Sequence, residues 1–135
     1  MAVTKTIVKR VRQQAVIKFV GDGQANVDLD ADLKTSDETF LGYANTNVMI
    51  TGMVWSTSGG AGGPITIKRP STGANVIVLW GTDNWSLTQS FGFYDPANTN
   101  ANINITMPSD GGTLYLTVSK KTGYREPQLN LTAPN

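Results

Sequence analysis

The chain contains neither cysteine nor histidine. Without cysteine it can form no disulfide framework and no thiolate zinc site. Without histidine it lacks the usual general base at neutral pH and the commonest metal ligand. Nucleophilic systems of the Ser-His-Asp and Cys-His types are therefore excluded.

Strong net charge and long apolar runs are also missing. The net charge of +1 predicts no strong bulk attraction to nucleic acid or to a membrane surface. No run approaches the length of a transmembrane helix. The opening "MAVTKTIVKRVRQQAV" is interrupted by basic residues and has no apolar h-region, so it does not resemble a signal peptide. We expect one domain that is made in a bacterial cytoplasm, with no membrane partner and no nucleic-acid partner.

Apolar and polar residues alternate along several segments. Residues 103–107 read "INITM", residues 114–118 read "LYLTV", and residues 85–93 follow the same period with one exception. This period predicts strands with one buried face and one solvated face. We therefore expect Ile105 and Leu116 to lie in the core.

Turn residues separate these segments. "GDG" at residues 21–23 and "SDGG" at residues 109–112 are typical of tight turns. "GTDN" at residues 81–84 lies between Trp80 and Trp85, which predicts a hairpin with both tryptophans on its core-facing side.

About eight or nine short strands at this spacing predict an all-β fold. We expect an antiparallel β-sandwich, jelly-roll-like, with extended N- and C-terminal arms; a small closed barrel is the alternative. The predicted organisation is a basic N-terminal arm over residues 1–14, a β-sandwich domain over residues 15–121 and a C-terminal tail over residues 122–135.

Basic residues are concentrated at the start of the chain. Lys5, Lys9, Arg10 and Arg12 all precede the first acidic residue, and their segment lacks a clean core pattern. We predict that these four side chains bind an assembly partner, with several weak ion pairs acting together. Their target would be an acidic surface on that partner or on a neighbouring copy.

Six of the ten acidic residues lie between Asp22 and Glu38, and Asp28, Asp30 and Asp32 alternate within this cluster. A calcium loop starting at Asp28 would need glycine at its sixth position and glutamate at its twelfth. Those positions hold Leu33 and Thr39. We therefore predict no metal and no cofactor, and interpret the three aspartates as the solvated face of an extended segment that offers an acidic partner surface.

The carboxylates and the tryptophans could act on carbohydrates in two ways, by hydrolysis or by binding. Paired carboxylates could hydrolyse glycosides, but the acids outside the cluster lie mostly in turn sequences such as "TDN", "YDP" and "SDG". We therefore expect no enzyme. Tryptophans could instead stack on a bound sugar, in which case Trp55 or Trp85 would be needed for glycan binding. Strand parity favours the other interpretation, in which Trp80 and Trp85 form a cross-strand pair in the core.

Three segments resemble a known group of proteins: "MAVTKTIVKRVRQQAVIKFVGDG", "ITIKRPSTGANVIVLWGTDNWSL" and "GTLYLTVSKKTGY". They are similar to small structural proteins of tailed bacteriophages, especially cyanophages and other marine phages. The resemblance implies a virion protein on the capsid surface, of the decoration or cement type. Its implied partners are the major capsid protein and further copies of itself as a homo-oligomer.

Two other classes remain open. A tail, neck or baseplate component of the same virion would share this composition. A carbohydrate-binding module that contacts the host surface is the other alternative.

Overall fold

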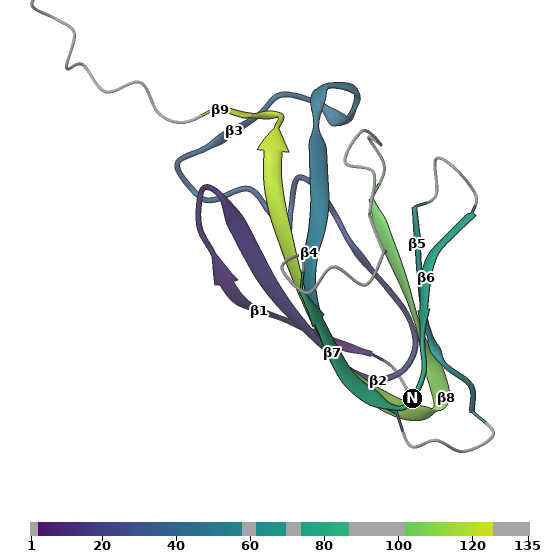
Figure 1. Ribbon diagram of the computed structural model, residues 1–135. Helices are drawn as coiled ribbons and strands as arrows, with labels where there is room; N and C mark the ends of the chain where they lie inside the picture. Colours follow the sequence, from purple (N-terminus) through teal and green to yellow (C-terminus); the bar gives the residue numbers. More distant parts are fainter. Residues whose placement is uncertain (1–2, 58–61, 70–73, 87–101, 126–135) are drawn as a thin grey trace, which may run out of the picture.

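The computed structural model describes residues 3–57, 62–69, 74–86 and 102–125, which form an almost entirely β structure (Figure 1). Seven strands belong to one continuous antiparallel sheet, and two short strands form a second sheet. The elements are β1 (Thr4–Arg10), β2 (Gln14–Val27), β3 (Thr39–Phe40), the 3-10 helix η1 (Tyr43–Asn45), β4 (Asn47–Thr57), β5 (Ile65–Arg69), β6 (Ala74–Leu79), β7 (Thr82–Ser86), β8 (Ile103–Thr122) and β9 (Tyr124–Arg125).

The two longest strands, β2 and β8, pair along their length and bend at the same place. Their register runs without a break from Gln14 to Gly21 and resumes at Gly23, which pairs with Met107. Gly21 and Gly23 have φ angles of 124° and 103°, in a region that residues with a side chain rarely adopt. The predicted turn sequences "GDG" and "SDGG" are therefore bends within paired strands.

This bend folds the sheet into two layers. In the first layer, residues 14–21 of β2 pair with the end of β8, which pairs with β4, and β4 pairs with β7. In the second, residues 23–27 of β2 pair with the start of β8, followed by β5 and then β6. With β1 added beside β2, the first layer has five strands and the second has four, and β2 and β8 belong to both layers of this antiparallel sandwich. The predicted antiparallel sandwich is confirmed.

The alternative of a closed barrel does not apply to the described strands. β1, β6 and β7 each pair on one side only, so the layers have open edges.

The core lies between the layers, and both Ile105 and Leu116 are fully buried in it, as predicted. The other fully buried large side chains are Ile17, Phe19, Leu29, Leu33, Ile50, Ile65, Ile67, Ile103 and Leu114.

The predicted N-terminal arm extends the first layer instead of standing apart from it. Its residues Thr4–Arg10 form β1, which pairs with the first half of β2 and carries a bulge between Ile7 and Lys9. At the other terminus, Tyr124–Arg125 pairs with Thr39–Phe40 as β9 and β3. Residues 126–135 of the predicted tail lie outside the described residues.

The predicted hairpin at residues 81–84 is wrong. β6 pairs with β5 and β7 pairs with β4, so the connection crosses from one layer to the other. Alternation of apolar and polar residues predicts which face of a strand is buried, but it does not predict which strand lies beside it. As a result Trp80 does not enter the core and is 64% exposed. The part of the predicted strand at residues 87–93 lies outside the described residues.

Candidate functional site

The predicted basic residues lie against the predicted acidic segment of the same chain. The hairpin of β1 and β2 places Lys5 Nζ 2.6 Å from Asp32 Oδ2. The Arg12 guanidinium lies 2.8 Å from Asp37 Oδ2. These two ion pairs join segments more than twenty residues apart in the sequence, so the charge order along the chain reflects contacts inside it.

The other two predicted basic residues differ from each other. Arg10 donates from Nη1 to the backbone carbonyl oxygens of Ala31, at 3.2 Å, and Asp32, at 3.5 Å. Lys9 lies exposed beside the bulge of β1. Binding of these side chains to a neighbouring subunit stays a prediction.

The acidic segment is a compact loop, whereas the sequence predicted an extended strand. The Asp32 N–H donates to the Asp28 carbonyl at 3.1 Å, and the Lys34 N–H donates to the Asp30 carbonyl at the same distance. These bonds coil residues 28–34, so that Leu29 and Leu33 are both fully buried. The strand prediction is wrong because apolar side chains at positions i and i+4 also share one face of a helical turn.

The carboxylates of this loop bind the loop itself. Asp28 Oδ1 accepts hydrogen bonds from the N–H groups of Asp30 and Ala31 and from the Tyr43 hydroxyl. Partial burial raises the pKa of Asp28, but these hydrogen bonds outweigh it, and the net pKa is lowered. Asp32 Oδ2 accepts from the Asp28 N–H at 2.7 Å and from Lys5. Asp32 is almost fully buried, so it does not offer its charge to a partner.

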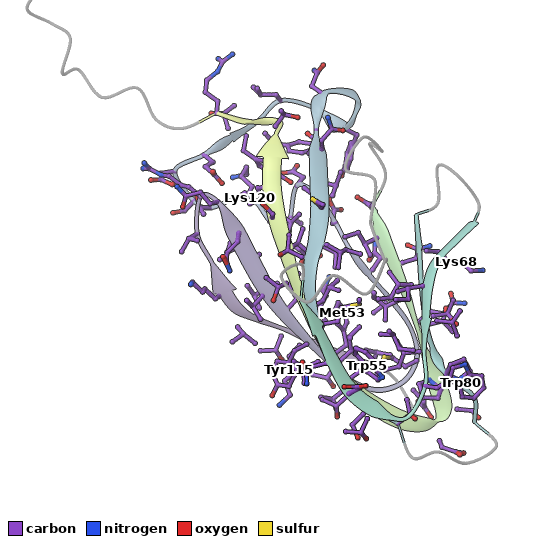
Figure 2. The ribbon with its side chains drawn as sticks, viewed as in Figure 1. Met53, Trp55, Lys68, Trp80, Tyr115 and Lys120 are labelled. Carbon is purple, nitrogen blue, oxygen red and sulfur yellow. The ribbon has the colours of Figure 1, made fainter. Side chains whose placement is uncertain are left out.

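A buried ion pair at the same end of the sandwich was not predicted. Lys120, near the end of β8, places Nζ 2.5 Å from Glu38 Oε1, and each side chain is 1% exposed (Figure 2). The ammonium also donates to the carbonyl oxygens of Leu33, at 2.6 Å, and Val11, at 3.0 Å. Its three donors are thus all used. Burial lowers the pKa of Lys120, an effect that the Glu38 carboxylate opposes.

Aromatic rings close this end. The Lys120 ammonium lies 4.6 Å from the centre of the Tyr124 ring, within the range of a cation–π interaction. The Tyr124 hydroxyl donates to the Leu29 carbonyl at 2.6 Å, and burial raises the pKa of Tyr124. Phe40 packs against both Tyr124 and Tyr43. We call this assembly of residues 28–46, Lys120 and Tyr124 the charged end of the sandwich.

At the opposite end lie the bend and the exposed Trp80 (Figure 2). Trp55, on β4, packs against the core, and its indole N–H donates to the Trp80 carbonyl at 3.0 Å. The Trp55 ring is thus partly used in packing, and the Trp85 side chain lies outside the described residues. Trp80, which the sequence assigned to the core, is instead exposed, and stacking of a tryptophan on a sugar stays an untested alternative.

The described side chains bear on the predictions for metal binding and for membrane spans. Within residues 3–57, 62–69, 74–86 and 102–125, no three carboxylates converge as metal ligands. In the same ranges, no helix is long and apolar enough to cross a membrane. The titratable groups that do meet are satisfied by one another and by backbone groups.

Comparison with known proteins gives no relative: no family model, no curated protein and no solved structure matches this chain.

Proposed function

We propose that this chain is a structural protein of a tailed-phage virion, which binds across contacts between major capsid subunits and stabilises the head. The three segments that resemble phage structural proteins motivate the proposal. Antiparallel sandwiches, jelly rolls among them, recur in viral capsid domains and in lectins, so the fold agrees with this role without deciding it. The satisfied polar groups of the charged end fit a protein whose side chains stabilise a framework.

The observation that carries the proposal is the outer face of the first layer, formed by β1, β2, β8, β4 and β7. Val54, at 53% exposed, lies near its centre, and Val20 is 39% exposed. One row across the five strands contains Thr6, Lys18, Tyr115, Val54 and Asn84. This row has one cation and no acid.

The neighbouring row has the same character. It contains Thr4, Val20, Thr113, Ser56 and Thr82, all uncharged. A face with a single charged side chain in two rows avoids the large cost of burying ions, and a low content of charged residues is typical of the centre of a protein interface. Open strand edges beside it offer further backbone groups to a partner.

The contacts of the basic residues bear on self-association. Lys5 and Arg12 bind acidic residues of their own chain. Exchange of β1 (Thr4–Arg10) between two copies would form the Lys5–Asp32 ion pair in trans, a simple route to the proposed homo-oligomer. Many weak contacts across a particle then act together through multivalency.

A particle-binding assay with undecorated capsids tests the capsid role. We expect Val54→Lys and Val20→Lys to weaken attachment because each places a charge in the apolar face. The matched control is Val78→Lys on β6, which is as exposed as Val20 but belongs to the other layer. Full attachment of the Val54→Lys variant would contradict docking through the first layer.

The number of copies per virion separates the capsid role from the tail, neck or baseplate alternative. Quantitative mass spectrometry of purified virions should give a copy number comparable with that of the major capsid protein. A copy number similar to that of tail or baseplate proteins would contradict a capsid role.

A further inference from the structure

A polar groove lies on the outer face of the second layer, and none of its lining residues belongs to the charged end. It has a volume of about 310 Å³ and is lined by Gln24, Ala25, Asn26, Lys68, Asn104, Ile105 and Thr106. These residues come from β2, β8 and β5, which are adjacent strands. Figure 2 shows Lys68 on the side of the sandwich formed by this layer.

The strand register explains why the surface is hollow here. Asn104, on the central strand, pairs with Asn26 on one side and with Lys68 on the other. In the next row, Thr106 pairs with Gln24. The short side chains of Asn104 and Thr106 therefore form a floor between the longer Gln24 and Lys68. Three strands and two rows span about 10 Å by 7 Å, the scale of a small ligand.

The groove stands on a rigid base. The residues between the lining side chains point inward, where Ile105 and Ile67 are fully buried in the core. Strand alternation thus holds the polar side chains in fixed rows. A binding surface built on strands needs little reorganisation when a ligand arrives.

The polar groups of the groove are free for a ligand. In the ranges that the structure describes, the side chains of Gln24, Asn26, Asn104, Thr106 and Lys68 form no hydrogen bond or ion pair with another protein group. The nearby Lys5 ammonium, which donates to the Asn26 carbonyl, is already paired with Asp32. Lys68 is therefore the available cation.

The chemistry of these groups defines the ligand class. Each amide and hydroxyl both donates and accepts hydrogen bonds, as sugar hydroxyls do, whereas the Lys68 ammonium only donates. A single cation is too little for a nucleic acid, whose binding depends on several phosphate contacts. We propose that this groove binds a short saccharide that carries a carboxylate, with Lys68 at the carboxylate and the Asn104 row at the hydroxyls.

The groove is open to solvent, so we expect the binding of one saccharide to be weak. Several copies on one particle would compensate through multivalency. This inference does not depend on the capsid role. If the first layer docks on a capsid, the groove on the opposite layer faces outward and stays accessible.

NMR titration of the ¹⁵N-labelled full chain tests the proposal with two methyl glycosides, methyl β-D-glucuronide and methyl β-D-glucoside. They share the ring and differ in one carboxylate. We expect saturable shifts of the side-chain amides of Gln24, Asn26 and Asn104 with both. The glucuronide should bind roughly threefold more tightly at low salt, the scale of one exposed ion pair, and this preference should fall at high salt.

Three variants locate the binding. Asn104→Ala should abolish the shifts produced by both glycosides, while its melting temperature stays unchanged because Asn104 is exposed. Lys68→Met should remove the preference for the glucuronide and leave binding of the glucoside. Lys18→Met, on the outer face of the first layer, is the matched control and should change neither.

Three results would overturn the proposal. The first is the absence of saturable shifts with either glycoside. The second is equal binding by Asn104→Ala and the unchanged chain. The third is a set of shifts centred on Trp80, which would move saccharide recognition to the bend. Capsid attachment is measured separately, so none of these results affects the proposed capsid role.

Discussion

The two ends of the sandwich use their residues in opposite ways. The charged end holds many of the charged side chains, yet its central pair is buried and its loop carboxylates accept bonds from the protein itself. The end at the bend instead leaves a large aromatic side chain, Trp80, mostly in water. A cluster of charges in a sequence can therefore indicate internal order, while an aromatic residue in an apolar run can lie at the surface.

The largest expected effect comes from breaking the buried pair. Glu38→Leu would leave the Lys120 ammonium buried without its carboxylate, and should lower the free energy of unfolding by about 3–5 kcal/mol. Adding Lys120→Met should restore part of the loss, because no unpaired charge remains buried, although the Leu33 and Val11 carbonyl oxygens lose their donor. Urea denaturation of the single and the double variant measures both free energies of unfolding. A double variant as unstable as the single one would show that the ion pair itself is required.

Glycines at the two ends provide a matched comparison. A Cβ at Gly123, where φ is 102°, would lie 2.6 Å from Thr46 Cα, so Gly123→Ala should destabilise by about 3 kcal/mol through backbone strain and overlap. Gly81, where φ is 71°, has open space around it, and Gly81→Ala should cost only about 1 kcal/mol. Thermal unfolding of the two variants checks the difference. Equal losses of stability in the two variants would mean that overlap with Thr46 does not add to the cost of backbone strain at Gly123.

Acid should weaken the charged end first. Hydrogen bonds from Thr35 and Arg12 lower the pKa of Asp37 to about 2, from an ordinary value of 3.8, and the pKa of Asp28 is also lowered. Carboxyl groups with lowered pKa values stabilise the fold above pH 4, and this contribution is lost as the pH falls from about 4 to about 2. Asp37→Asn should therefore flatten the fall in melting temperature over this range. If the melting temperature of Asp37→Asn fell with pH as steeply as that of the unchanged chain, Asp37 would not be the group responsible.

The smallest effect is expected at the other end. Trp80→Ala removes a large side chain that is mostly in water, so the free energy of unfolding should change by less than about 0.5 kcal/mol. Its backbone carbonyl, which accepts from Trp55, is kept. A loss above about 2 kcal/mol would show that Trp80 packs against residues outside the described ranges.

Much of the fold could be predicted from alternation alone. The period in residues 103–107 and 114–118 correctly places Ile105 and Leu116 in the core. Alternation does not say which strands become neighbours, so the crossover after Trp80 was interpreted as a hairpin. Partner choice depends on packing between the layers, which no local pattern contains.

The charged end was only partly predictable. Lys120 has the same parity as Leu116 and Val118, a signal that its side chain points inward. Its partner Glu38 could not be identified, because the loop that carries it coils instead of extending. The groove shows the same limit: alternation predicts that Asn104 and Thr106 face outward, but only the register brings Gln24 and Lys68 beside them.

One measurement tests the central claim, that the charged end stabilises the fold from inside while charges elsewhere remain available. It compares the urea denaturation of Lys120→Met with that of Lys68→Met, the same substitution at a buried and an exposed lysine. We predict a loss of about 3–5 kcal/mol for Lys120→Met, which leaves the Glu38 carboxylate buried and unpaired, and a change within about 0.5 kcal/mol for Lys68→Met. Equal effects of the two substitutions would contradict the account.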